Sequence, residues 1–525
     1  MLVDRSISLT AMLRTRMGKV CVALQAPTVE ELLERANASL AESHFLEFRL
    51  DALEAPHTPR AAIKAIADFL LAHKDVAAIA TCRRKAYGGA FAGSLGEEIL
   101  ILAHAAECGF AMVDLEIESA EQCSTDQIEF LRENGVALMI SSHDFNGAGD
   151  ADAVFARIQR FEPDFVKIVT TAHTLTDSLE LLHWIDQRSA QAQVVGIAMG
   201  EPGIVSRILS LRAGSAFTFA APPDGHATAA GQVSARTLKD LYRIETLDQA
   251  TRIYGVVGSP VAHSLSPLMQ NTAFHRERVN AVYLPLKTDS IDDLLTLARK
   301  LPLSGFSVTM PHKQTILQHL ANVDPMAAKL GACNTVRTGA DGKLYGFNTD
   351  VAGILRPLEK RLALKGARVL VLGAGGAARA AAFGLAEKGA NVSVWSRSET
   401  RSRELMATGA SMGIRLIARK QIPETEFDVL INATPCGMHG NAHPLPLETS
   451  EWRARLVFDL VYNPLETPLL QAAKARGLAT IQGVEMFVQQ GARQFEIWTG
   501  KAAPEAEMQR VVLFALNKQH HATVV

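Results

Sequence analysis

Short apolar runs alternate with longer amphipathic stretches through the first half of the chain. The runs are rich in Val, Ile, Phe and Ala and have the length of buried strands. The stretches between them, such as Thr28–Leu40 and Leu175–Gln187, repeat apolar residues every three or four positions, as helices do. The expected strands are Val20–Ala26, Phe45–Leu50, Val76–Arg83, Met112–Ile117, Val136–His143, Phe165–Thr171, Val194–Met199 and Phe217–Ala221.

Eight β-then-α units fall between residues 19 and 243, which is the count of a closed (β/α)8 barrel, the TIM barrel. An open doubly wound sheet with helices on both faces is the alternative. We favour the barrel because the eight units counted here are the number that a closed barrel requires.

A different pattern begins after a join near Leu241–Arg252. A strand is expected at Ile253–Gly258, and a later strand, Ala367–Leu372, runs into the turn Gly373-Ala-Gly-Gly-Ala-Ala378 and the helix Ala377–Lys388. A glycine-rich turn between strand and helix binds dinucleotides, because the glycines permit the tight turn and the helix N-terminus meets the pyrophosphate. The sequence therefore predicts an α/β protein whose second half contains a Rossmann domain.

The residues after the next expected strand, Asn391–Trp395, indicate which dinucleotide binds. NAD sites usually place an acid there for the ribose hydroxyl, whereas an arginine suits a 2′-phosphate. This chain has Ser396-Arg-Ser398, and the nearest acid, Glu399, comes three positions past Ser396. NADP(H) is the expected cofactor, with Arg397 as a solvated surface residue the alternative.

The composition of the chain mainly excludes certain kinds of partner, cofactor and domain organisation. The chain of 525 residues is too long for one ordinary domain, and its net charge of −2 gives no reason to expect nucleic acid or an acidic membrane as a partner. No apolar run approaches the length of a membrane span, and the six cysteines have no metal-type spacing, so no metal is expected. Scattered cysteines are typical of a cytoplasmic protein. The sequence predicts no oligomeric state.

The first 18 residues are expected to be an N-terminal extension. Arg5, Arg14 and Arg16 outnumber the single acid Asp4, which resembles a transit peptide weakly, but no cleavage-site pattern follows. A cytoplasmic location is therefore expected over plastid import.

Charged residues within the expected barrel strands are informative because a barrel strand is buried on both faces. Glu47 and Arg49 lie two apart and so share one face, and Lys167 lies inside its strand. Each has a structural alternative: Glu47 and Arg49 as an ion pair, and a lone histidine as a core residue. The polar residues within or just past these strands are Glu47, Arg49, Arg83, His143, Lys167, Arg207 and Gln232.

The chemistry that fits these residues is a Schiff base. Burial and the nearby arginines Arg49, Arg83 and Arg207 are expected to lower the pKa of Lys167 and free its amine to attack a ketone. His143 is then placed to move protons beside the iminium carbon and to a leaving hydroxyl. Arg207 is expected to bind a substrate carboxylate.

The second half brings a separate set of polar residues. Ser264 and Ser266 lie beside an expected helix N-terminus, which favours either an anion or an ordinary N-cap. Lys313 follows an expected strand that runs from Gly305 to Pro311, and turns carry Asn334 and Asp350. Each of these also fits ordinary turn chemistry.

Residues 19–243 resemble the type I 3-dehydroquinate dehydratases. The matching motifs are Leu46-Glu-Phe-Arg-Leu-Asp51, Ser141-Ser-His-Asp144, Val166-Lys-Ile168, Met199-Gly200 with Ser206-Arg207, and Gly231-Gln232. The resemblance implies that Lys167 forms the imine and that His143 is the general acid and base. It implies a substrate-binding set of Glu47, Arg49, Arg83, Arg207, Thr228 and Gln232.

Two positions depart from that family. The family usually has a glutamate that supports the histidine where this chain has Tyr87, so proton transfer is expected to be slower or to depend on another group. Thr228 replaces the family's serine and keeps the hydroxyl, so little effect is expected.

Residues from about 253 to 518 resemble the shikimate dehydrogenases. The motifs are Ser264-Leu-Ser-Pro267, Asn271, Val308-Thr-Met-Pro-His-Lys313, Gly331-Ala-Cys-Asn-Thr335, Asn348-Thr-Asp350, Gly373–Ala378, Asn432-Ala-Thr434, Asp459-Leu-Val-Tyr-Asn-Pro464, and Gly483-Val-Glu-Met486 with Gln490. The resemblance implies a catalytic pair, Lys313 and Asp350. It implies a substrate domain from residues 253–350 with 481–525, and an NADP-binding domain from residues 351–480.

The same resemblance implies the binding residues. Those expected to hold the substrate are Ser264, Ser266, Thr309, Asn334, Tyr462 and Gln490. Those expected to hold the cofactor are Gly373, Gly375, Gly376, Ala377, Ser396, Arg397, Ser398, Arg401, Thr434, Gly483 and Met486. The family's usual Asn-Arg-Thr is Ser396-Arg-Ser398 here.

Together the two halves predict a bifunctional enzyme with the domain order of plant enzymes. It is expected to dehydrate 3-dehydroquinate to 3-dehydroshikimate and to reduce that product to shikimate with NADPH. Quinate dehydrogenase activity in the second half is an alternative, which Ser264 disfavours. A sensor or repressor without catalysis is another, disfavoured because Lys167, His143, Lys313 and Asp350 are all present and no DNA-binding segment is appended.

Overall fold

The computed structural model describes residues 17–524 apart from 56, 134 and 263. The expected N-terminal extension therefore lies almost entirely outside the described residues. The chain divides into two compact units. One comprises the residues up to Thr251 with Leu286–Leu301, which include helix α11 (Ile291–Lys300); the other comprises Arg252–Pro285 with Pro302–Val525.

The first unit is built on one parallel sheet in the order β7-β6-β5-β4-β3-β2-β1-β8. The Ala216 N–H, just before β8, donates to the Val194 carbonyl at the start of β7 at 2.8 Å, which brings the two ends of the sheet together. The closed barrel expected from the sequence is thus confirmed, and the alternative of an open sheet is wrong. The strands are β1 (Val20–Leu24), β2 (Phe45–Arg49), β3 (Ala77–Thr81), β4 (Met112–Glu116), β5 (Ala137–His143), β6 (Phe165–Thr171), β7 (Val194–Met199) and β8 (Thr218–Ala220).

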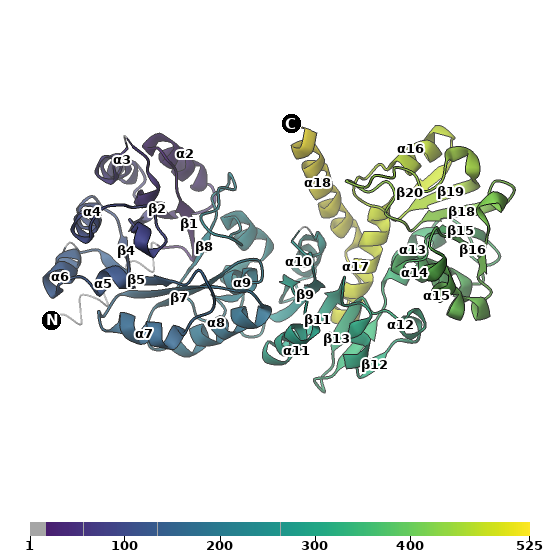
Figure 1. Cartoon of the computed structure of the whole chain (residues 1–525), viewed down its shortest axis with the longest axis horizontal. Coiled ribbons are helices and arrows are strands. Elements are labelled where there is room, and N and C mark those ends of the chain that lie inside the picture. The colour runs from purple at the N-terminus through teal and green to yellow at the C-terminus, as the bar shows by residue number, and fades with distance from the viewer. Residues whose placement is uncertain (1–16, 56, 134, 263, 525) are drawn as a thin grey trace. The chain divides into compact units, whose positions relative to one another are not determined.

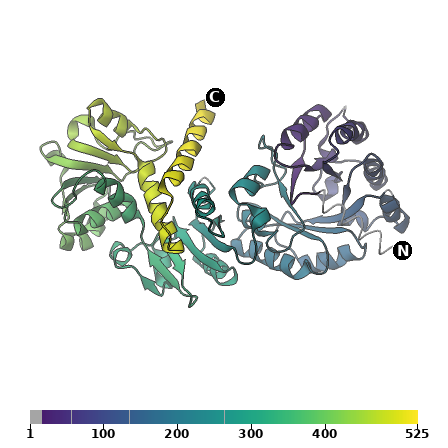
Figure 2. The ribbon, with the colours of Figure 1, turned by 180° about the vertical axis from the view of Figure 1, so that it is seen from behind.

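Helices surround these strands, as both views of the ribbon show (Figure 1, Figure 2). Threonine and serine N-caps start several of them; Thr28, for example, accepts from the Glu31 N–H at 3.2 Å. The helices are α2 (Val29–Ser39), α3 (Pro59–Ala72), α4 (Leu95–Glu107), α5 (Ile117–Ala120), α6 (Thr125–Glu133), α7 (Ala151–Gln159), α8 (Leu175–Arg188) and α9 (Ile204–Leu209).

An apolar floor fills one end of the barrel interior. The rings of Phe45 and Phe165 meet Phe217 edge-on, with centroids 5.0 and 5.8 Å away. Side chains alternate along a strand, so the residues two positions further on, Glu47 and Lys167, face the same interior. The carboxyl ends of the strands therefore carry charge above a hydrophobic base.

The second unit contains a mixed sheet in the order β10-β9-β11-β13-β14-β12. Strand β11 runs parallel to β9 and antiparallel to β13. It ends at Val308, earlier than the expected end at Pro311, which has no backbone N–H for a ladder. The elements are β9 (Arg252–Gly258), α10 (Ser266–Arg276), β10 (Ala281–Lys287), β11 (Leu303–Val308), β12 (Asn322–Val323), α12 (Pro325–Leu330), β13 (Thr335–Thr338) and β14 (Leu344–Phe347).

A second sheet of this unit is wholly parallel, in the order β17-β16-β15-β18-β19-β20. Counted along the chain this is the 3-2-1-4-5-6 order of the doubly wound dinucleotide fold, as the sequence predicted. The elements are β15 (Arg368–Leu372), α14 (Gly376–Glu387), β16 (Asn391–Trp395), α15 (Glu399–Gly409), β17 (Arg415–Leu416), β18 (Glu426–Asn432), β19 (Arg453–Asp459), α16 (Pro468–Ala475) and β20 (Ala479–Ile481).

Three further helices complete this unit: α13 (Asp350–Glu359), α17 (Gly483–Thr499) and α18 (Glu505–Val524). Apolar residues of α17 and α18 share a core with β9 and α10. The backbones of α13 and α17 approach closely at Gly353, where an added Cβ would lie 2.8 Å from the Met486 carbonyl oxygen and 3.0 Å from the Gln490 Cβ. This crossing fixes where α17 presents its side chains.

We expect Gly353→Ala to lower the free energy of unfolding of the second unit by about 1 kcal/mol, because overpacking costs about 1–3 kcal/mol. Alanine by itself is the better helix former by up to about 1 kcal/mol. Denaturant unfolding measures the balance. Gly96→Ala in α4 is the control: its Cβ would meet nothing within 4 Å, so it should stabilise, and a stabilising Gly353→Ala would contradict the close crossing.

Candidate active sites

A cavity of about 550 Å³ opens among the carboxyl ends of the barrel strands. The sequence-predicted polar residues converge on it from strands and from the loops that follow them, as a TIM-barrel site requires. Those lining it are Glu47, Arg49, Arg83, His143, Lys167, Arg207, Thr228 and Gln232.

Lys167 lies in this cavity and is only 4% exposed. Its Nζ is 2.9 Å from Asp114 Oδ2, 3.6 Å from Glu47 Oε1 and 4.2 Å from the centroid of the Phe219 ring. The Thr81 hydroxyl donates to the same Glu47 oxygen at 2.8 Å and so fixes it. The sequence suggested only arginines as the charged neighbours of Lys167. The structure also places two carboxylates beside the amine, and they compensate its burial.

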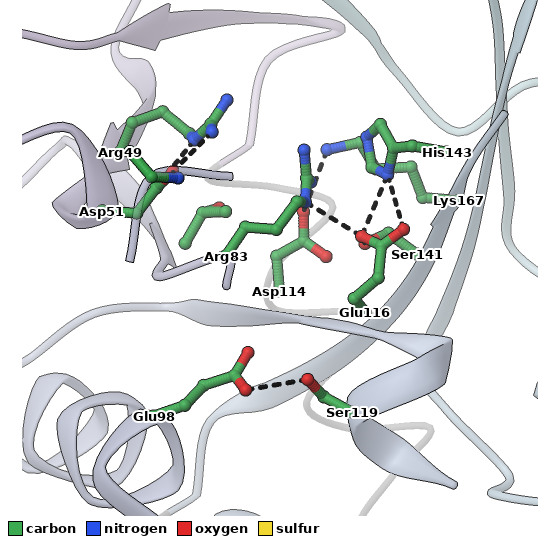
Figure 3. Close-up of polar contacts among 12 residues, drawn as sticks. Arg49, Asp51, Arg83, Glu98, Asp114, Glu116, Ser119, Ser141, His143 and Lys167 are labelled. Atoms are coloured by element: carbon green, nitrogen blue, oxygen red, sulfur yellow. Dashed lines mark hydrogen bonds and ion pairs between the residues drawn. The ribbon is translucent and has the colours of Figure 1, made fainter. Parts of the chain in front are cut away.

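His143 faces a carboxylate as well (Figure 3). Its Nδ1 lies 3.0 Å from both carboxylate oxygens of Glu116. Glu116 also accepts from Ser141 Oγ at 3.0 Å and pairs with Arg83 Nε at 2.9 Å. Burial lowers the pKa of His143 well below its usual value, and the positive charges of Arg83 and Lys167 act in the same direction. Burial and these charges favour the neutral imidazole, and the contact with Glu116 favours the tautomer with the proton on Nδ1.

At the barrel site, sequence reasoning missed Asp114 and Glu116. They lie two apart on β4, and Arg83 spans them, with Nη2 3.6 Å from Asp114 and Nε 2.9 Å from Glu116. The signal was present: alternate acids in the buried strand Met112–Glu116 share one face, by the rule that singled out Glu47 and Arg49.

Arg49 does not form the alternative ion pair with Glu47. It binds Asp51 through two bonds of 2.9 and 2.7 Å, and Asp51 also accepts from the Ala90 N–H at 3.1 Å. Arg49 is thereby tied to the loop after β3. In that loop the Tyr87 hydroxyl contacts the Gln122 amide rather than His143.

Arg207 is a buried cation with weak protein partners. It is 1% exposed, and its Nη atoms reach only the carbonyls of Phe219 and Ala230, each at 3.4 Å. Within the described part of the chain its Nε has no hydrogen-bond partner, and burial lowers its pKa to about 10. Gln232, which lines the same cavity, accepts from the Thr228 N–H through its side-chain Oε1 at 2.8 Å. Such a guanidinium is suited to an anionic ligand.

A second cavity, of about 430 Å³, lies in the second unit between the mixed sheet and α17. It gathers the expected catalytic pair, the expected substrate residues and one expected cofactor residue. These are Ser264, Ser266, Thr309, Lys313, Asn334, Asp350, Tyr462, Met486 and Gln490.

Lys313 and Asp350 form an ion pair of 2.8 Å in this cavity. The other oxygen of Asp350 accepts from the Asn334 amide at 2.8 Å, and Asn334 in turn accepts from the Thr349 N–H at 2.8 Å. Sequence reasoning missed Gln494, which lines the cavity one helical turn after Gln490 and accepts from Ser307 at 2.9 Å. The i, i+4 spacing of the two glutamines was the available signal.

The glycine-rich turn leaves room for a ligand. Gly373 has φ +112°, where other residues are strained, and a Cβ on Gly375 or Gly376 would meet nothing within 4 Å. Helix α14 begins there, with Ala377 in its first turn and no side chain capping its N–H groups. The arrangement fits a dinucleotide phosphate.

The expected phosphate-binding residues divide into two kinds. Ser398 caps α15 by accepting from the Arg401 N–H at 3.4 Å, and Ser396 accepts from the Ser398 N–H at 3.2 Å. Arg397 and Arg401 are exposed, and among the described residues neither has an ion-pair partner. Their guanidinium groups are therefore free for a phosphate.

A buried carboxyl connects the remaining expected cofactor residues. Asp459 accepts from the Asn432 amide at 2.9 Å and from the Val461 N–H at 3.1 Å, and Asn432 accepts from the Thr434 hydroxyl at 2.7 Å. Burial raises the pKa of Asp459 to about 6. Because a Cβ on Gly483 would lie 2.3 Å from the Val461 carbonyl, only glycine fits beside this loop.

Three family models match the chain. The model described as type I 3-dehydroquinase matches residues 20–249, the shikimate dehydrogenase substrate binding domain matches 256–336, and the shikimate 5′-dehydrogenase C-terminal domain matches 483–513.

Curated relatives agree with these matches, and a similar solved structure is also found. The chain is 34% identical over 506 residues to the chloroplastic bifunctional 3-dehydroquinate dehydratase/shikimate dehydrogenase of Arabidopsis thaliana, covering 93% of this chain and 83% of that protein. It is 39% identical over 275 residues to the NADP(+) shikimate dehydrogenase of Bacillus anthracis, covering 51% of this chain and 99% of that one. The shikimate 5-dehydrogenase of Thermus thermophilus, solved with NADP(H) and shikimate, is 37% identical with a TM-score of 0.46, covering 50% of this chain and 100% of that one.

A TIM barrel with a buried lysine, followed by a unit that holds a lysine–aspartate pair beside its mixed sheet and also contains a doubly wound dinucleotide fold, defines a two-site α/β enzyme. The chain belongs to the family of bifunctional 3-dehydroquinate dehydratase/shikimate dehydrogenases. None of the described helices has the length and apolar character that crossing a membrane requires.

Proposed function

We propose that the barrel, residues 19–243, dehydrates 3-dehydroquinate and that the second half reduces the product, 3-dehydroshikimate, to shikimate. The observation that carries the proposal is a lysine beside an acid in each cavity: Lys167 with Asp114 at 2.9 Å and Lys313 with Asp350 at 2.8 Å. Residues 253–350 with 481–525 form the substrate domain, and residues 351–480 form the NADP domain. The six unpaired cysteines fit a cytoplasmic location.

In the barrel, Lys167 adds to the ketone carbon of the substrate, and loss of water leaves an imine. His143 takes a proton from the neighbouring carbon, and the electron pair left behind expels the hydroxyl one carbon further on. That hydroxyl leaves as water with the proton that His143 returns. Hydrolysis of the imine then releases the product and restores the amine.

Arg207 binds the substrate carboxylate in this proposal. Its buried, under-coordinated guanidinium gains a charge-assisted partner when the anion arrives. Glu47, Arg49, Arg83, Thr228 and Gln232 line the same cavity and hold the hydroxyl groups and the ring.

In the second half, Lys313 holds a proton donor at the ketone oxygen, and Asp350 keeps the ammonium aimed. Ser264, Ser266, Thr309, Asn334, Tyr462 and Gln490 orient the substrate. NADPH supplies the hydride when it is bound.

The chain offers a fitting site for that cofactor. Gly373, Gly375, Gly376 and Ala377 receive the pyrophosphate at the open N-terminus of α14. Arg397 and Arg401 take the 2′-phosphate, beside Ser396 and Ser398. Thr434, Gly483 and Met486 would hold the nicotinamide.

A coupled assay tests the two roles at once. Lys167→Ala should abolish NADPH consumption from 3-dehydroquinate but keep it from 3-dehydroshikimate, because only the second site remains intact. Lys313→Ala should still form 3-dehydroshikimate, seen as ultraviolet absorbance, but no shikimate.

Borohydride provides a separate check on the imine. Reduction in the presence of 3-dehydroquinate should attach substrate mass to a peptide containing Lys167, and Lys167→Ala should remain unmodified. Dehydration that persists in Lys167→Ala would eliminate the imine route.

Cofactor selectivity is tested by direct binding. We expect Arg397→Ala to weaken NADPH roughly 10- to 100-fold while leaving NADH nearly unchanged, because only NADPH carries the 2′-phosphate. Quenching of protein fluorescence gives both dissociation constants.

Arg403→Ala is the matched control for this measurement. Arg403 lies on α15, the helix that begins two residues after Arg397, but it pairs with Glu399 at 3.0 Å, so its removal should leave NADPH binding intact. Equal losses for NADPH and NADH in Arg397→Ala would refute the phosphate assignment.

A further inference from the structure

The histidine of the barrel has a carboxylate partner where the sequence motif suggested none. The position expected to carry a supporting glutamate holds Tyr87, whose hydroxyl contacts Gln122. Glu116, on the neighbouring strand β4, occupies the supporting role by geometry, with both oxygens 3.0 Å from His143 Nδ1 (Figure 3).

We propose that Glu116 is the positioning residue of His143 and holds it in the tautomer that proton transfer requires, in place of an acid at position 87. The proposal rests on the dehydratase function argued above. Glu116 touches the histidine and not the reacting atoms, so it acts through His143.

The contacts of Glu116 leave it one orientation. Ser141 Oγ donates to its carboxylate at 3.0 Å, and Arg83 Nε does so at 2.9 Å. Because an ionised carboxylate can only accept hydrogen bonds, its third contact, His143 Nδ1, must also be a donor. His143 Nδ1 therefore carries the proton, and the lone pair lies on Nε2. Within the described residues Nε2 has no hydrogen-bond partner, and His143 lines the cavity. The nitrogen that faces the substrate is the basic one.

The charges around His143 decide the direction of the pH effect. Arg83 on the loop after β3, Lys167 on β6 and Arg49 on β2 disfavour the imidazolium, whereas Asp114 on β4 favours it. Glu116 adds a carboxylate in direct contact. Removing that charge makes protonation of His143 harder, so the acid limb of the rate profile should move to lower pH.

The test is Glu116→Gln in the full chain, an isosteric change. We expect kcat for dehydration to fall about 10²- to 10³-fold, because the amide accepts poorly and can donate to Nδ1, which stabilises the wrong tautomer. KM should change less than about threefold, since Glu116 does not bind substrate. The acid limb of kcat should shift down by about one pH unit or more.

Two controls separate positioning from packing. The first control, Glu98→Gln, alters another buried acid. Glu98 accepts from Ser119 at 2.8 Å and, among the described residues, makes no hydrogen bond to His143. The second control, Tyr87→Phe, removes the hydroxyl at the position where the family usually has glutamate. Both should keep kcat within about threefold of the parent protein. The reductase activity of the second half reports in every variant whether the rest of the chain is intact.

Borohydride trapping distinguishes the possible failures. An unmodified parent protein would refute the dehydratase function itself. In Glu116→Gln, normal trapping at Lys167 with low kcat supports positioning. Unchanged kcat, loss of trapping together with kcat, a fixed acid limb, or an equal fall in Tyr87→Phe would each overturn the proposal.

Discussion

Compensation of buried charge is the constraint on which the barrel site depends. Lys167 and Arg83 carry positive charge into an interior whose floor is aromatic, and such burial is strongly unfavourable unless partners are within reach. Strand β4 supplies them: Asp114 meets the lysine, Glu116 meets the histidine, and Arg83 spans both acids. One strand thus sets the positions of Lys167 and His143, the two groups that the proposed chemistry uses. Arg207 is the exception, since it is buried and, among the described residues, its Nε has no hydrogen-bond partner.

The sequence was sufficient for the architecture because periodicity and glycine positions report local structure. All the barrel strands and the Rossmann turn appear where the pattern predicted them, with ends shifted by a few residues. Lys167 was found because a charge inside an apolar strand is conspicuous. Its partner Asp114 was not, because the choice among nearby carboxylates depends on which strand lies opposite, and only the closed barrel decides that. Glu47 was only the structural alternative as partner of Arg49, which instead binds Asp51, two residues further along the chain where β2 has ended and a 3-10 turn has begun.

The second site could be predicted more fully from the chain, because its residues lie in compact motifs. Lys313 and Asp350 come after β11 and β14, and Asn334 directly precedes β13, so adjacency of these strands in one mixed sheet brings the three residues together. The hydrogen bond between Asn432 and Asp459 could not be predicted from the sequence, because it is a side-chain contact between the carboxyl ends of β18 and β19. Ser398 shows the opposite case: a residue expected to hold phosphate has a local task as a helix cap.

The two lysines differ in exposure, and the proposed chemistry explains the difference. Lys167 has a side chain 5% exposed, whereas that of Lys313 is 35% exposed. An amine that forms an imine must be shielded from water, because water hydrolyses the covalent intermediate before the elimination is complete. A lysine that only supplies a proton needs a route by which solvent returns that proton after each turnover. Deep burial of Lys167 and partial exposure of Lys313 therefore suit the two different tasks that these lysines perform on a carbonyl group.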